Sequence, residues 1–236
     1  MSTRPRSILC AVLDGAALGG DAHAAATALF EAGVDWIQLR DRSLEAAPLL
    51  ALARALVSAR NVVRATSPDP QRRTGGAHAP RVVVNKRGDV ALAAGADGVH
   101  LGLDALDTRS ARSLFAAGGG GTPLVGASIH AVSELEASLA AGEPIDYVHL
   151  APIWPPRSKP AERPPLGLAT LRQAARIAER AGLRVFAQGG LDPARAAEAV
   201  AAGAAGIAVT GIVSQAPDRA AAVRALRRAL DGAVPQ

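Results

Sequence analysis

The sequence predicts a single-domain α/β protein with the architecture of a (β/α)8 TIM barrel over residues 1–236. Three observations lead to this prediction. The chain has 236 residues, the usual size of one such barrel. One pattern recurs along it, in which an alanine-rich helical stretch ends in Ala-Gly and is followed by a short apolar run. These runs do not alternate with polar residues, as expected for parallel strands that are buried on both faces.

Eight apolar runs are predicted strands, and helical segments alternate with them, which favours a closed barrel over an open, doubly wound sheet. Asp192 and Pro193 give one helix an N-cap acid and a proline at its first position. The predicted strands are Ile8–Leu13, Val34–Leu39, Arg81–Val84, Asp97–Leu101, Leu124–Ala127, Asp146–Leu150, Leu183–Ala187 and Gly206–Thr210. The predicted helices are Asp21–Ala32, Ser43–Ser58, Asp89–Ala94, Thr108–Ala117, Val132–Ala141, Leu168–Ala181, Pro193–Ala202 and Pro217–Leu230. Glycines that adopt positive φ at no steric cost are expected to end five of them: Gly33, Gly95, Gly142, Gly182 and Gly203.

Two segments interrupt this pattern. Residues 61–80 are polar and rich in Pro, Gly and Arg, and they precede the third strand. We expect them to be a flexible surface insertion at the N-terminal face of the barrel. Residues 152–165 follow the sixth strand and therefore lie at the C-terminal face, where they are a candidate active-site loop.

The composition argues against nucleic-acid and membrane partners. The net charge is +5, but the basic residues are scattered among acidic ones, and aromatic residues make up only 3% of the chain. No apolar run reaches the roughly 18 residues that span a bilayer, and the N-terminus lacks the long apolar region of a signal peptide. The single cysteine, Cys10, lies in an apolar run and is expected to be a core residue. We expect a cytoplasmic protein, with a homo-oligomer left open.

Polar side chains occur where the predicted strands end, which is where this fold places its catalytic groups. Gln38 and Arg40 alternate along a strand, so both are expected to point into the barrel mouth. Arg42 is either a ligand contact or a solvated residue. The remaining candidates for substrate binding are Asn85, Lys86, Ser128, Ser158 and Lys159.

Glycines follow the last two strands, at Gly189, Gly190 and Gly211, with Thr210 beside them. In many barrels the loops at this place, together with a helix N-terminus, bind phosphate through backbone N–H groups. Glycine pairs also occur in ordinary turns. The cationic residues Arg40, Lys86 and Lys159 at the same rim favour the phosphate site.

Two histidines and an acid also follow strands. His130 begins a loop, where an imidazole can transfer a proton at neutral pH or play a structural part. His100 lies within an apolar strand, which favours a hydrogen-bonded core histidine. Asp14 is either a helix N-cap or a ligand contact.

These residues, taken together, resemble the thiamine phosphate synthase / TenI superfamily, with the similar motifs in one order from about Ile8 to about Ser214. Members of that superfamily handle thiazole phosphates in thiamine biosynthesis. The resemblance implies a thiazole-phosphate pocket that includes Ser128 and Lys159, a phosphate site at the two glycine segments, and an acid–base residue at His130. The similar motifs are residues 38–42 (QLRDR), 84–85 (VN), 95–102 (GADGVHLG), 126–130 (GASIH), 151–160 (APIWPPRSKP), 187–193 (AQGGLDP) and 208–212 (AVTGI).

The superfamily implied by this resemblance has two branches. The synthases join a pyrimidine diphosphate to a thiazole phosphate and use magnesium, whereas the TenI-like tautomerases move a proton on a carboxythiazole phosphate without metal. The chain departs from the synthase pattern at both expected magnesium carboxylates. Lys86 replaces the acid after strand three, and Ala105 replaces the second acid after strand four, with Asp104 one residue away. The segments Arg40-Asp41-Arg42 and Pro156-Arg157-Ser158-Lys159 replace Arg-Glu-Lys and Thr-x-Thr-Lys.

We therefore expect, first, a metal-free thiazole tautomerase, an isomerase in which His130 moves the proton. No cofactor is expected for this reaction. The alternative is a divergent thiamine phosphate synthase, a transferase, with magnesium or with cations such as Arg42, Lys86 and Lys159 neutralising the pyrophosphate. A third possibility is a non-catalytic protein that binds a phosphorylated ligand at the same site.

Overall fold

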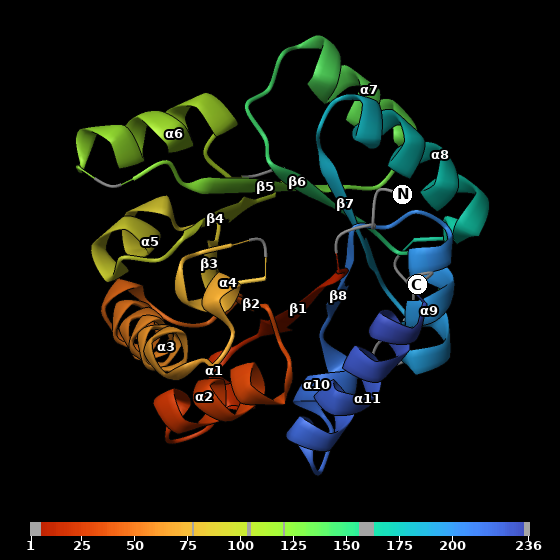
Figure 1. Cartoon of the computed structure of the whole chain (residues 1–236). Helices are drawn as coiled ribbons and strands as arrows, with labels where there is room; N and C mark the ends of the chain where they lie inside the picture. Colours follow the sequence, from red (N-terminus) through yellow and green to blue (C-terminus); the bar gives the residue numbers. More distant parts are fainter. Residues whose placement is uncertain (1–5, 77, 103–104, 120, 156–162, 234–236) are drawn as a thin grey trace. The chain divides into compact units, whose positions relative to one another are not determined.

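The computed structural model describes residues 6–76, 78–102, 105–119, 121–155 and 163–233. All eight predicted strands are present, and they pair in chain order as a closed parallel barrel. The predicted (β/α)8 fold class is confirmed. The strands are β1 (Ile8–Leu13), β2 (Trp36–Leu39), β3 (Arg81–Asn85), β4 (Gly98–Leu101), β5 (Leu124–Ile129), β6 (Tyr147–Leu150), β7 (Arg184–Gln188) and β8 (Gly206–Val209) (Figure 1).

The chain forms two compact units: Cys10–Val125, and Met1–Leu9 with Gly126–Gln236. The helices of the first unit are α1 (Gly15–Leu18), α2 (Ala22–Ala32), α3 (Ala46–Thr66), α4 (Pro70–Arg73), α5 (Gly88–Ala94) and α6 (Thr108–Ala117). Those of the second are α7 (Val132–Ala140), α8 (Gly167–Arg180), α9 (Pro193–Ala201), α10 (Gly211–Ser214) and α11 (Arg219–Gly232).

Helix α3 covers the sheet of the first unit. By its length of 21 residues and its hydropathy it could cross a membrane. It instead packs against α2, α5 and β3, and it lies beside α2 and α5 in Figure 1. Leu49, Leu56 and Val63 form part of its buried face. These contacts are those of a core helix.

The helix predicted to end at Ser58 is longer than expected, so that prediction is wrong. Residues 61–66 of the predicted insertion continue α3, because the buried periodicity extends to Val63. The rest of the segment holds α4 and turns. Arginines tie it to backbone carbonyl groups: Arg72 to Phe30 (3.1 Å), Arg73 to Ser67 (2.8 Å) and Arg81 to Gly75 (2.9 Å).

A carboxylate connects α3 to the sheet. Asp97 accepts hydrogen bonds from Arg60 (2.6 Å), Arg64 (2.8 Å) and the backbone N–H of Val82 (2.8 Å). Its side chain is only 10% exposed. Ion pairs of this kind are weak when exposed but costly to break when buried. The network therefore fixes the C-terminal half of α3.

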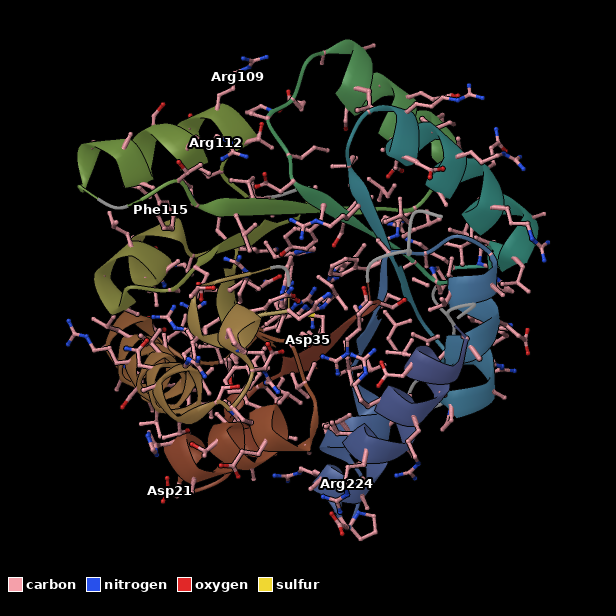
Figure 2. All side chains as sticks on the ribbon, in the orientation of Figure 1. Asp21, Asp35, Arg109, Arg112, Phe115 and Arg224 are labelled. Atoms are coloured by element: carbon pink, nitrogen blue, oxygen red, sulfur yellow. The ribbon has the colours of Figure 1, made fainter. Side chains whose placement is uncertain are left out.

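Helix α6 illustrates how the amphipathic helices lie on the strands. Its Arg109 is at the outer face and its Phe115 at the inner face (Figure 2). Phe115 is buried, with 3% of its surface exposed. The apolar stripe is thus the side that meets the sheet.

In the second unit, hydrogen bonds join the start of β1 to α11 and to the residue before β8. Arg227 of α11 donates to the backbone carbonyl of Ser7 (2.8 Å) and pairs with Asp231 (3.0 Å). The N–H of Ile8 donates to Ala205 (3.0 Å). The start of β1 is therefore anchored to α11 and to the segment that leads into β8.

The predicted helix signals are confirmed. Asp192 is the predicted N-cap and accepts from the N–H of Arg195 (2.9 Å), and Asp21, for which no cap was predicted, accepts from the N–H of Ala24 (2.9 Å). All five predicted C-terminal glycines have positive φ, between 60° and 118°. Cys10 is buried, as expected.

Candidate active site

The strand register of the first unit places several predicted site residues side by side. Leu39 of β2 pairs with Val84 of β3, so the residues that follow them, Arg40 and Asn85, are neighbours at the strand ends. Asn85 in turn pairs with His100 of β4. Gln38 shares a strand face with Arg40, because side chains alternate. Gln38 is 1% exposed, and its Nε2 has no hydrogen-bond partner among the described residues. Such a buried amide nitrogen is available to a ligand.

Lys86 has an unusual backbone conformation. It is the one non-glycine residue in the described part of the chain with a positive φ, 63°. The N–H of Arg87 donates to the carbonyl of Asn85 (2.8 Å), so Lys86 is the centre of a γ-turn. The backbone N–H of Lys86 donates to the carbonyl of His100 (2.8 Å) and continues the hydrogen bonding between β3 and β4. Such a conformation costs about 1–3 kcal/mol and is typical of functional sites.

Asp41 organises the loop that carries Arg40 and Arg42. One carboxylate oxygen accepts the N–H of Gly15 (2.9 Å), and the other accepts from Ser43 and Leu44. Partial burial acts to raise the pKa of Asp41, but these hydrogen bonds outweigh it and hold the pKa below its ordinary value. The sequence assigned Asp41 no role, because its partner Gly15 lies on another loop.

Of the residues flanking these strands, Arg40 and Arg42 are exposed, whereas Asn85 and Lys86 are half-buried. His100 is buried, with 2% of its surface exposed, as expected for a core histidine. Asp14 is the N-cap of α1 and accepts from the N–H of Ala17 (2.8 Å). The helix cap that the sequence offered for Asp14 is therefore present.

In the second unit, His130 is held in one orientation. Its Nδ1 lies 2.7 Å from the carbonyl oxygen of Ala151. A carbonyl can only accept, so Nδ1 carries the hydrogen and a neutral ring keeps its lone pair on Nε2. The backbone N–H of His130 donates to the carboxylate of Glu134 (2.8 Å). The half-buried imidazole is therefore oriented to accept a proton at Nε2.

A second histidine lies in the same unit and was not predicted. His149 of β6 is in register with Ser128 and Phe186 and is 1% exposed. Burial lowers the pKa of His149 to about 3, and a hydrogen bond with Gln188 only partly opposes this. The ring is neutral at physiological pH and fixes the amide of Gln188 directly before the glycine pair. The signal in the sequence was a histidine inside an apolar strand.

The glycine pair after β7 is packed against the loop after β6. Gly189 and Gly190 have φ of 99° and 64°, and a Cβ on them would lie 2.8 Å from the Cβ atoms of Pro152 and Trp154, respectively. The side chain of Arg195 donates to the carbonyl of Gly190 (2.6 Å) and lies over the ring of Trp154. Close packing therefore requires these glycines whether or not an anion binds.

Thr210 and Gly211 follow β8, which pairs with β7 through Gln188 and Ala208. The four predicted phosphate-binding residues thus follow two adjacent strands. Thr210 is exposed, and no side chain caps α10, which begins at Gly211. The first N–H groups of a helix have no partner within it. The phosphate site remains a prediction that this arrangement permits.

The predicted loop residues Arg157, Ser158 and Lys159 lie outside the described residues, as does Asp104. Within the described ranges, no group of three or more His, Cys, Asp or Glu side chains could hold a metal ion. A lysine stands where the synthase pattern has an acid, and it would repel a divalent ion. The described residues therefore do not fit a magnesium site of the expected kind.

Comparisons with known proteins agree over most of the chain. A family profile described as thiamine monophosphate synthase matches residues 9–213. A thiamine-phosphate synthase from Mycobacterium sp. (strain KMS) is 38% identical over 221 residues, covering 89% of this chain and 87% of that protein. One from Roseiflexus sp. (strain RS-1) is 35% identical over 210 residues, covering 89% and 79%.

One longer relative and one solved structure also match the chain. The bifunctional ThiM/ThiE protein of Symbiobacterium thermophilum is 38% identical over 199 residues, or 84% of this chain, but the match spans only 36% of that longer protein. A solved thiamine phosphate pyrophosphorylase from Pyrococcus furiosus has a TM-score of 0.74 over 97% of this chain and 98% of its own, at 23% identity, and so supports the fold. The profile match and the identities show that the chain belongs to the thiamine monophosphate synthase (TMP-TENI) family.

Proposed function

We propose that this chain is a thiamine-phosphate synthase, a transferase that joins a hydroxymethylpyrimidine diphosphate to a thiazole phosphate. One observation carries the proposal: relatives named thiamine-phosphate synthase are 35–38% identical to the chain over 89% of its length. These comparisons do not support the isomerase, which was the first expectation from the sequence. They fit the alternative, a transferase.

In this reaction, the bond between the pyrimidine methylene carbon and the diphosphate oxygen breaks, and the pyrophosphate leaves with the electron pair. The thiazole nitrogen forms a new bond to the same carbon. The protein needs to hold two anionic substrates and neutralise the charge of the leaving group. Charge neutralisation is therefore the main demand on its side chains.

The residues at the strand ends suit these tasks. We assign the pyrimidine diphosphate to Gln38, Arg40 and Asn85, because amides pair with ring nitrogens and amino groups while the guanidinium pairs with phosphate. We assign the thiazole phosphate to the second unit, with Ser128 beside the ring. Its phosphate is assigned to the amides near Gly190 and Gly211.

A second candidate function is thiazole tautomerisation, favoured by the geometry of His130. The hydrogen bond from Nδ1 to Ala151 leaves Nε2 as an acceptor, which is what a general base requires. Such a base would take a proton from the thiazole ring and return it at another position. No metal takes part in this step, which also suits the lysine at position 86.

Two assays on the purified chain separate the candidates. In one, the pyrimidine diphosphate and the thiazole phosphate are mixed with the protein, and thiamine phosphate is measured by mass spectrometry with magnesium and with EDTA. In the other, isomerisation of a carboxythiazole phosphate is followed by NMR.

Thiamine phosphate formation supports the transferase. Isomerisation without thiamine phosphate would replace it with the tautomerase. Thermal stabilisation by thiazole phosphate with no product in either assay would leave a binding protein and refute both enzymes.

A further inference from the structure

We infer that Arg195 is a positioning residue for the thiazole-phosphate pocket of the second unit, where it fixes Gly189 and Gly190 against the loop after β6. The inference rests on the proposed function, because it concerns the binding of one of its two substrates. It goes beyond that function by giving a part in substrate binding to a side chain of α9, to which the sequence assigned no role. Three features of the second unit carry it.

The first feature is the place of Arg195 in its helix. Helix α9 begins at Pro193 after the N-cap Asp192, so Arg195 lies in the first turn. Its N–H donates to the carboxylate of Asp192 (2.9 Å), which fixes the backbone at this position. A positive charge in the first turn opposes the helix dipole. The helix itself therefore does not favour an arginine here, and the half-buried side chain indicates a contact outside the helix.

The second feature is the pair of contacts that this side chain makes. Nη1 of Arg195 donates to the carbonyl of Gly190 (2.6 Å), and the guanidinium carbon lies 5.6 Å from the centre of the Trp154 ring. A hydrogen bond from a charged donor is stronger than one between neutral groups, and a cation over an indole face adds attraction. One side chain thus holds the loop after β7 and the loop after β6 together.

The third feature is the backbone between these loops. The N–H of Ile153 donates to the carbonyl of Gln188 (2.8 Å), and that of Trp154 to Gly189 (3.3 Å). Arg195 adds a third hydrogen bond at the next carbonyl. In a trans peptide the carbonyl oxygen and the N–H hydrogen point in opposite directions. The N–H group of each of these three peptides therefore points away from the donor that holds its carbonyl, and anion sites are built from oriented backbone N–H groups of this kind.

The experiment is calorimetric titration of the purified chain with thiazole phosphate and, separately, with the pyrimidine diphosphate. Arg195→Met keeps an unbranched side chain that can pack on Trp154 but removes the donor. It should weaken the binding of thiazole phosphate at least about fivefold, because one peptide of the pocket is no longer held in place. The affinity for the pyrimidine diphosphate, which is assigned to the first unit, should change less than about twofold. A general loss of structure would weaken both ligands.

Two further variants are controls. Arg195→Lys restores a charged donor, and a single carbonyl needs only one, so this variant should recover most of the affinity for thiazole phosphate. Arg176→Met removes an exposed arginine from α8 of the same unit and should change neither affinity more than about twofold. Melting curves of all variants check that the fold is intact.

The inference would be overturned by a wild-type chain that binds no thiazole phosphate, or by Arg195→Met binding it as tightly as the wild type. Equal losses for the two ligands, or an Arg195→Lys variant as weak as Arg195→Met, would overturn it as well.

These outcomes are separate from those of the proposed function. Thiamine phosphate formation together with an unchanged affinity in Arg195→Met would refute the part given to Arg195 and leave the transferase in place. Binding of thiazole phosphate that depends on Arg195, without thiamine phosphate formation, would refute the transferase and leave the positioning role in place.

Discussion

Replacing Asp41 by Asn tests whether one carboxylate holds the loop that carries Arg40 and Arg42. Its two oxygens accept hydrogen bonds from Gly15 at 2.9 Å, from the N–H and hydroxyl of Ser43 at 2.9 and 2.7 Å, and from Leu44 at 3.2 Å. An Asn side chain can keep the bonds to one oxygen, but its NH2 group would then face the N–H of Gly15. The link between the loops after β1 and β2 would be lost.

The size of the effect follows from these contacts. Hydrogen bonds to a charged group contribute about 1.5–3 kcal/mol each, and the half-buried position of Asp41 reduces this. We expect Asp41→Asn to lose about 1–3 kcal/mol of unfolding free energy. For a domain of this size that corresponds to a fall in Tm of about 3–10 °C at pH 7. The KM for the pyrimidine diphosphate should rise as well, because Arg40 loses its support.

The stability that the Asp41 carboxylate contributes depends on pH, and the direction of this dependence follows from its pKa. The folded-state pKa of Asp41 is lowered below its ordinary value of 3.8. Its contribution is therefore fully present above about pH 4 and is lost as the pH falls through the folded-state pKa. The difference in Tm between the wild type and Asp41→Asn should shrink below pH 4.

The control is Asp21→Asn, on α2 of the same unit and labelled in Figure 2. Among the described residues, the Asp21 carboxylate accepts from the N–H of Ala24, and Asn caps a helix as well as Asp does. Its Tm should stay within about 2 °C of the wild type. Equal Tm values for the two variants at pH 7, or a Tm deficit of Asp41→Asn that is unchanged at pH 3, would show that the Asp41 carboxylate does not stabilise this loop.

Four further substitutions test the packing of the fold and the roles of site residues. Asp97→Asn should cost about 3–5 kcal/mol in chemical denaturation, because it leaves the buried Arg60 and the half-buried Arg64 without their carboxylate; a loss below about 1 kcal/mol would contradict this. Gly190→Ala places a Cβ at positive φ against Trp154 and should lower Tm and shift tryptophan fluorescence, and unchanged spectra would speak against the packing argument. Lys86→Asp restores an acid where the synthase pattern has one, so thiamine phosphate formation should then respond to magnesium, and a variant indifferent to the ion would contradict the interpretation that Lys86 replaces a magnesium ligand. His130→Ala should reduce any thiazole isomerisation by roughly 10²–10⁴-fold, and equal turnover would remove His130 from that reaction.

The fold could be predicted because its signals are local. Each strand is a short apolar run, and Gly33, Gly95 and the other terminal glycines mark helix ends through a backbone conformation that other residues avoid. The end of α3 could not be placed, because its last turns are polar on the outside. They are held by Asp97, which lies more than thirty residues away along the chain.

From the sequence, the site could be predicted only as a set of residues that follow the strands, without their arrangement in space. Register between strands brings Arg40 next to Asn85, and register cannot be read from one strand alone. The γ-turn at Lys86, the hydrogen bonds of Asp41 and the pair His149–Gln188 are likewise products of tertiary structure. The sequence indicated a ligand-binding role for the glycine pair. The structure adds a packing role, because a side chain at Gly190 would collide with Trp154, and this contact could not be predicted from the sequence.

The proposed transferase activity is tested most directly by the rate at which the wild-type chain forms thiamine phosphate from the two substrates, in EDTA and in magnesium. We expect that thiamine phosphate forms and that EDTA lowers its rate of formation less than about tenfold. A chain that forms no thiamine phosphate in either buffer would contradict the proposed function, and one that forms it only with magnesium would contradict the conclusion that the described residues do not fit a magnesium site.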